Sequence, residues 1–227
     1  MPNLDRNLND IRQRIAAACA VVGRDPNSVT LVAVSKTVSV ETVQEAVKLG
    51  VTDFGENRVA ELVHKKTLVP QVRWHMIGRL QTNKVKDVVG KACLIHSLDR
   101  WNLAESLHKR AEMLGETVPV LLQVNIAGEE QKAGLPSDEV LPFLQSMDQL
   151  PQVKIMGLMT MAPISDEAEA SRPIFRELAQ LRERLQQHEI PNISLQYLSM
   201  GMSQDFEVAI QEGANLVRIG SSIFDNR

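Results

Sequence analysis

Lys36 is the residue whose position in this sequence points most directly to chemistry. It follows an apolar, β-branched run at 30–35, which predicts a strand buried on both faces. A lysine at the end of such a strand is poorly hydrated, which lowers its pKa and frees the amine to form an imine (Schiff base) with a carbonyl compound. Lys84, Lys132 and the other lysines lie on polar stretches and are weaker nucleophiles for want of desolvation. The competing interpretation is a side chain that extends from the strand end into solvent.

Two segments rich in glycine and serine predict a phosphate site. Ser199, Gly201 and Ser203 follow one predicted strand, and Gly220 and Ser221 follow the last one. Glycines allow close approach to the backbone, and a helix that begins at Ser203 would present free N–H groups to an anion. Each segment alone is also typical of an ordinary turn. Together they stand in the two loops where barrel proteins often bind phosphate.

Arg218 lies inside the apolar run 216–219, where a charge is costly unless it is paired. It either points at a ligand from the wall of a barrel or forms a salt bridge with a carboxylate. An imine-forming lysine, a phosphate site and a wall arginine describe a site for pyridoxal 5'-phosphate (PLP), with the arginine at the pyridine nitrogen. Arginine can only donate to that nitrogen. The nitrogen then stays unprotonated, which weakens the ring as an electron sink.

Other polar and sulfur-containing residues have simpler interpretations. Asn57 either caps the helix that it precedes or contacts a ligand, and capping is the simpler role. His75 is more typical of a hydrogen-bonded core histidine than of a catalytic one. Tyr197 is the only tyrosine in the chain. Cys19 and Cys93 are the only cysteines, both predicted to be buried free thiols, so we expect neither a disulfide nor a metal site.

Apolar strand-like runs alternate with amphipathic helical runs along the whole chain. The predicted strands cover 30–35, 52–55, 72–77, 94–98, 118–126, 153–161, 193–198 and 216–219. The predicted helices cover 4–22, 40–49, 56–69, 84–89, 101–114, 137–147, 166–188 and 203–211, with Ser137 and Ser203 as caps. Such alternation implies parallel strands with right-handed crossovers, and eight repeats favour an α/β fold of the TIM-type (β/α)8 barrel class. The N-terminal helix precedes the first strand and is an extra element, which we expect at the lower end of the barrel.

The composition restricts the class of protein. The chain has 227 residues and a formal net charge of -3, with 44% hydrophobic and 23% charged residues. These values are typical of a globular protein with a sizeable core, whereas a nucleic-acid-binding domain is expected to be basic. No apolar run approaches the ~18 residues of a membrane span, and the N-terminal residues are too charged for a signal peptide. We therefore expect a cytoplasmic protein that binds neither nucleic acid nor membranes.

Seven short blocks together resemble a known family. They are residues 32–37 (VAVSKT), 54–57 (FGEN), 74–78 (WHMIG), 80–84 (LQTNK), 157–159 (GLM), 198–203 (LSMGMS) and 217–220 (VRIG). In this order they look like the signatures of the pyridoxal phosphate homeostasis proteins, which are single-domain relatives of the alanine racemase N-terminal barrel. The resemblance covers nearly the whole chain. Asp225 departs from it, because the family often has glycine there.

The resemblance implies one PLP-binding domain over residues 1–227. The residues that it assigns to the cofactor are Lys36 for the Schiff base, Asn57 near the ring, Arg218 at the ring nitrogen, and Ser199, Gly201, Gly220 and Ser221 at the phosphate. It also implies a cytoplasmic, mostly monomeric protein that sequesters PLP and hands it on without catalytic turnover, with apo PLP enzymes as candidate acceptors.

Two enzymatic functions compete with this one. Two-domain racemases place a tyrosine from a second, β-rich domain opposite the lysine. Here only residues 222–227 follow Ser221, and Tyr197 lies within the predicted barrel, so we expect no racemase. A cofactor-free Schiff-base aldolase would need only Lys36 and a phosphate pocket. An absorption band near the visible would exclude the aldolase, and chiral product analysis would separate a carrier from a racemase.

Overall fold

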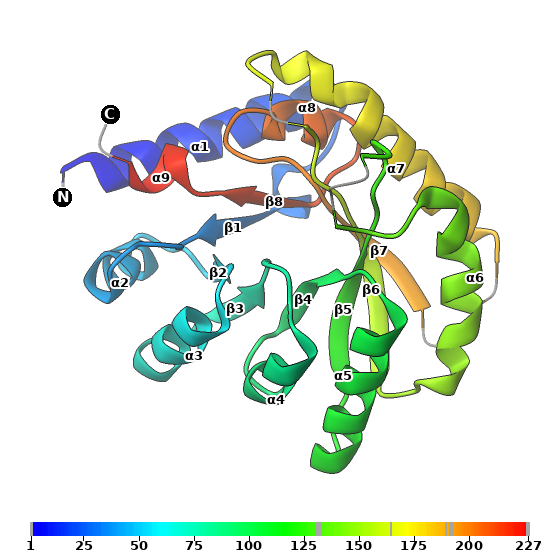
Figure 1. Cartoon of the computed structure of the whole chain (residues 1–227). Helices are drawn as coiled ribbons and strands as arrows, with labels where there is room; N and C mark the ends of the chain where they lie inside the picture. The colour runs from blue at the N-terminus through cyan, green and yellow to red at the C-terminus, as the bar shows by residue number, and fades with distance from the viewer. Residues whose placement is uncertain (1, 130–132, 164, 189, 191–192, 226–227) are drawn as a thin grey trace.

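The barrel predicted from the alternating pattern is confirmed. The computed structural model describes residues 2–129, 133–163, 165–188, 190 and 193–225. Eight parallel strands follow one another in chain order and close on themselves through pairing of β8 with β1 (Figure 1). The strands are β1 (Thr30–Val34), β2 (Asp53–Glu56), β3 (Arg73–Met76), β4 (Leu94–Leu98), β5 (Val118–Gln123), β6 (Val153–Met159), β7 (Ile193–Ser199) and β8 (Leu216–Ile219).

Helices surround the strands, and several begin later or break earlier than the periodicity predicts. They are α1 (Pro2–Val21), α2 (Val40–Lys48), α3 (Val59–Leu68), α4 (Val85–Val88), α5 (Trp101–Leu114), α6 (Val140–Gln145), α7 (Arg172–Gln186), α8 (Phe206–Gln211) and α9 (Ser221–Phe224). The long helix predicted from residue 166 begins only at Arg172, with proline in its first turn, where a missing N–H costs nothing. Ser137 and Ser203 do not cap helices, because Pro136 and Asp205 take the cap positions of the turn at 137–139 and of α8.

The extra N-terminal helix is confirmed, but its expected place at the lower end of the barrel is wrong. α1 lies on the outer wall beside α8 and α9, as Figure 1 shows. Arg14 of α1 pairs with Glu207 at 2.6 Å and stacks on the Phe206 ring. Because α9 has only four residues, it leaves the outside of the last strands bare. The apolar face of α1, which includes the buried Leu8, covers the outside of these strands.

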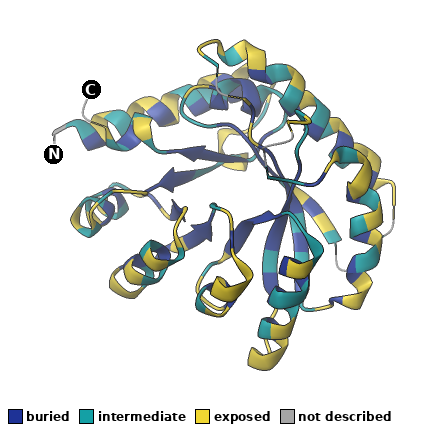
Figure 2. Cartoon of the chain, in the orientation of Figure 1, coloured by how far each residue is buried: buried dark blue, intermediate teal, exposed yellow. Residues whose placement is uncertain are grey.

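Burial divides the molecule into two apolar layers. The main core lies between the strands and the inner faces of the helices, so the strands are dark and the helices are banded in Figure 2. A smaller cluster fills the barrel interior, with Val32, Leu94, Leu121, Met159 and Leu216 as its buried members. Side chains alternate along a strand, so Arg218 shares the interior face with Leu216. The interior is therefore apolar in part and polar where functional residues stand.

Candidate functional site

Lys36 and Asn57 lie at the carboxyl ends of the neighbouring strands β1 and β2. The two strand ends lie at one level, because Val34 pairs with Gly55 in the sheet. The Ser35 N–H also donates to the Gly55 carbonyl at 3.0 Å. Gly78 closes this region from β3, because a Cβ there would stand only 2.2 Å from the Asn57 carbonyl oxygen. Both predicted site residues therefore stand on the same rim of the barrel.

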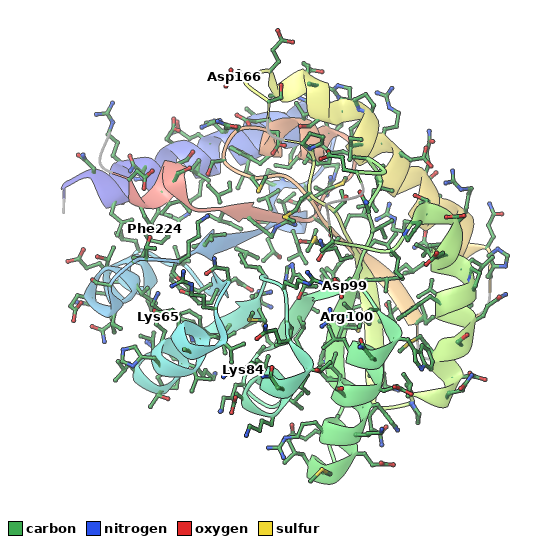
Figure 3. All side chains as sticks on the ribbon, in the orientation of Figure 1. Lys65, Lys84, Asp99, Arg100, Asp166 and Phe224 are labelled. Atoms are coloured by element: carbon green, nitrogen blue, oxygen red, sulfur yellow. The ribbon has the colours of Figure 1, made fainter. Side chains whose placement is uncertain are left out.

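The environment of these two side chains differs from the prediction. Lys36 is exposed, so the expected poor hydration of its amine is wrong for the protein without a ligand. The reason is that β1 ends at Val34 and Lys36 lies in the turn that follows, next to Thr37, whose φ is 64°. Lys84 is exposed as well (Figure 3), and Lys132 lies outside the described residues. Location rather than desolvation thus distinguishes Lys36.

Asn57 does not cap the helix that follows it. Arg58 holds the N-cap position of α3 and makes no side-chain capping bond. The Asn57 side chain is exposed on the rim, two residues after the register partner of Val34. The helix-capping role expected for Asn57 is therefore wrong. Its place beside Lys36 agrees with the alternative, a contact with a ligand.

The loops after β7 and β8 meet each other and the end of β1. The Arg218 N–H donates to the Gly201 carbonyl at 3.0 Å, and the Ser222 N–H donates to the Ser203 hydroxyl at 3.4 Å. A Cβ on Gly220 would stand 3.1 Å from the Val34 carbonyl oxygen, so this loop packs closely on the strand that leads to Lys36. The two glycine- and serine-rich segments thus form one surface next to the lysine.

Gly201 is required by the geometry of its loop. Its φ is +91°, which disfavours any side chain, and an added Cβ would stand 2.6 Å from the Ala209 Cβ and 2.9 Å from the Phe206 Cα. The loop therefore turns back against the start of α8 with bare backbone. Glycine is thus required here by the close packing of the loop on α8.

Arg218 is buried in the barrel wall. It donates to the Ser199 hydroxyl at 2.6 Å and to the Thr160 carbonyl at 3.0 Å. Among the described residues no carboxylate forms an ion pair with it, so the alternative of a salt bridge is wrong. Burial lowers the pKa of Arg218 to about 10, which still leaves it protonated at neutral pH. It is a preformed cation in the barrel interior.

The Ser199 hydroxyl is occupied inside the barrel rather than at the rim. It is fully buried, accepts from Arg218, and lies 2.9 Å from Nδ1 of His96. This arrangement conflicts with a phosphate contact through its side chain. His96 was missed by the sequence reasoning; a polar residue inside the apolar strand 94–98 was the available signal.

A buried ion pair supports the end of β1 from behind. Lys65 of α3 (Figure 3) donates to a Glu56 carboxylate oxygen at 2.7 Å and to the Ser35 carbonyl at 2.8 Å. The Ser35 hydroxyl donates to the same oxygen of Glu56 at 2.6 Å. These contacts fix the residue just before Lys36. No sequence signal identified Lys65, because a lysine on an amphipathic helix usually faces solvent.

Comparison with known proteins identifies the family. The alanine racemase N-terminal domain model matches residues 2–226. A pyridoxal phosphate homeostasis protein of Aquifex aeolicus is 45% identical over 227 residues, covering 99% of both chains. The chain belongs to the pyridoxal phosphate homeostasis protein family. The structure of PipY from Synechococcus elongatus PCC7942 with PLP bound has a TM-score of 0.81 and 37% identity, over 94% of this chain and 99% of that one. The family predicted from the seven sequence blocks is thus confirmed.

The same fold extends to more distant proteins. An alanine racemase of Clostridium difficile 630 has a TM-score of 0.79 at 15% identity, and this chain covers 57% of it.

Within the homeostasis family, the departure at Asp225 is structurally harmless. Its φ of -77° and ψ of 135° are ordinary extended values, so the final turn does not need glycine.

The lower end of the barrel holds a second polar region, away from the rim. A cavity of about 190 Å³ is lined there by Asp53, Arg73, Cys93 and Tyr197, together with Thr30 at the start of β1. Tyr197 is therefore at the opposite end of the barrel from Lys36. Cys93 is exposed and its predicted burial is wrong, because it precedes β4 at this opening, whereas the predicted burial of Cys19 is confirmed.

The described residues contain no group of three or more histidine, cysteine, aspartate or glutamate side chains placed to hold a metal ion. In the same part of the chain no helix has the length and apolar character needed to cross a bilayer.

Proposed function

We propose that this protein binds PLP and acts in its homeostasis, by holding the cofactor and handing it on. The observation that carries the proposal is the meeting of four neighbouring strand ends, in the order β7, β8, β1 and β2. Lys36 would hold the aldehyde, and Asn57 would lie beside the ring. Gly201, Gly220 and Ser221 would bind the phosphate. The PLP-bound PipY structure and the names of the relatives support the same ligand.

The residues present fit the cofactor. Bound PLP supplies an electrophilic aldehyde on an electron-withdrawing ring. Arg218 is a buried cation without a carboxylate partner among the described residues, so it can donate to a neutral ring nitrogen. Gly201, Gly220 and Ser221 lie in the loops after β7 and β8, which meet each other beside the end of β1 and would hold the phosphate there. We assign the Ser199 hydroxyl to Arg218 instead of to the phosphate.

A carrier role agrees with the geometry better than a racemase does. Racemisation needs proton-transfer groups on both faces of the substrate, each contributing about 10²–10⁴ in rate. The only tyrosine, Tyr197, stands at the other end of the barrel. Lys36, Asn57 and Ser221 are exposed on the rim, which favours exchange of the cofactor. We therefore propose a cytoplasmic monomer that supplies apo PLP enzymes and turns over no amino acid.

Reductive trapping tests the assignment of the lysine. Borohydride should fix one PLP per chain in the wild type and none in Lys36→Ala. Lys84→Ala is the matched control, since Lys84 is also exposed, and it should trap fully. Full trapping in Lys36→Ala would contradict the site. Steady formation of D-alanine from L-alanine by the loaded protein, lost in Lys36→Ala, would favour the racemase.

A further inference from the structure

A continuous chain of hydrogen bonds crosses the barrel interior behind the proposed cofactor site. From Arg218 it runs to the Ser199 hydroxyl at 2.6 Å, and from there to Nδ1 of His96 at 2.9 Å. Nε2 of His96 lies 2.9 Å from Nδ1 of His75, and Nε2 of His75 lies 2.9 Å from a carboxylate oxygen of Asp53. Five strands contribute one residue each, and all five residues are buried.

The direction of each hydrogen bond follows from the groups at the two ends. Asp53 can only accept, because hydrogen bonds outweigh its burial and hold the pKa of its carboxyl at about 2. The tautomer of His75 that donates from Nε2 to Asp53 accepts at Nδ1. His96 then donates from Nε2 and accepts at Nδ1 from the Ser199 hydroxyl. That hydroxyl in turn accepts from Arg218, so all donors point the same way.

The neutral state of His96 has a physical cause. Burial, with a smaller contribution from the positive charge of Arg218, lowers its pKa well below the ordinary value. A neutral ring at this place gives the Ser199 hydroxyl an acceptor, which orients its lone pairs toward the guanidinium. The chain thus links the buried cation to the carboxylate of Asp53 at the far end, and a buried charge without such support is costly.

We propose that His96 and His75, acting through Ser199, are positioning residues that hold the Arg218 guanidinium in place for the ring nitrogen of PLP. The proposal rests on the proposed function and adds residues that do not touch the cofactor. Its consequence is ligand selectivity. The hydrogen-bond chain determines how strongly the protein prefers an aldehyde whose ring carries a nitrogen acceptor. A group that merely fills the barrel would affect all ring types alike.

The test compares PLP with 1-deazapyridoxal 5'-phosphate, in which a C–H group replaces the ring nitrogen. The wild type should bind PLP more tightly by about tenfold or more, the value of one hydrogen bond to a charged group. His96→Leu and Ser199→Ala should lose most of this preference. His96→Asn should retain it, because the amide oxygen can accept from Ser199 in place of Nδ1. His75→Leu should act in the same direction as His96→Leu.

Controls separate this outcome from a loss of folding. Ser97→Ala removes a neighbouring buried hydroxyl that donates to the Gly78 carbonyl and takes no part in the hydrogen-bond chain. The preference of this variant for PLP over the deaza analogue should equal that of the wild type. Folded His96→Leu and Ser199→Ala that keep the full preference would overturn the proposal, and an unchanged His75→Leu would overturn the part assigned to His75. A wild type that binds both aldehydes equally would overturn it as well, while leaving PLP binding intact. Failure to bind PLP would instead refute the proposed function.

Discussion

Replacing Lys65 by methionine should destabilise the protein strongly. The change keeps most of the side-chain volume and removes the charge and the three donors of the ammonium group. Lys65 is 2% exposed and Glu56 0%, so the remaining carboxylate would be a buried charge with the Ser35 hydroxyl as its hydrogen-bond donor. The other oxygen of Glu56 already has no partner among the described residues. Water cannot replace the lost contact without opening the structure.

The expected size of the effect follows from this burial. Breaking a buried ion pair by removing one partner costs about 3–5 kcal/mol. For a chain of this length each kcal/mol shifts the thermal midpoint by about 2–4 °C, so the midpoint should fall by roughly 6–20 °C. Because Lys65 also holds the Ser35 carbonyl, Lys65→Met should weaken PLP trapping at Lys36.

Thermal and urea unfolding followed by circular dichroism would measure this loss. Lys66→Met is the matched control, since among the described residues Lys66 donates to the exposed Pro70 carbonyl alone. This variant should change stability by less than about 1 kcal/mol. The double variant Lys65→Met/Glu56→Gln should recover part of the loss, because it removes the unpaired charge. Equal stability of Lys65→Met and Lys66→Met would refute the reasoning, and so would a strictly additive double variant.

Two further changes test the rim loop and the lower end of the barrel. Gly201→Ala should lower both stability and PLP affinity, because its Cβ would stand 2.6 Å from that of Ala209. Gly115→Ala, at φ +65° with nothing within 4 Å, should cost only about 1–2 kcal/mol of backbone strain and leave affinity unchanged. Asp53→Asn should make the free energy of unfolding less sensitive to acid. The pKa of an aspartate in the unfolded chain is about 3.9, and in the folded protein the pKa of Asp53 is lowered to about 2. The carboxylate therefore contributes roughly 2–3 kcal/mol of stability above pH 5, and this contribution is lost as the pH falls to 2. Urea titrations between pH 5 and 2 that give the two proteins the same acid sensitivity would contradict this assignment.

The sequence by itself determined the fold class and the end of the barrel at which we propose the site. Apolar runs and helix periodicity are local patterns, and β4 and α5 agree with their predicted bounds. Parallel strands that close in chain order place all their carboxyl ends together, so Lys36 and Gly220 had to meet once the barrel was recognised. Helix starts were less predictable, because turns at 137–139 and 168–171 replace the first turns of two helices.

Only the tertiary structure decided which polar side chains face one another inside the barrel. The contact of Ser199 with His96 joins residues 103 positions apart, and it depends on the register of strands that no local pattern reports. The exposure of Lys36 depends on the turn that it forms with Thr37 after β1 ends. The burial of Lys65 depends on a carboxylate that β2 presents to α3. Periodicity predicts which face of an element is apolar, whereas the partner of a buried polar group is chosen by the closure of the whole barrel.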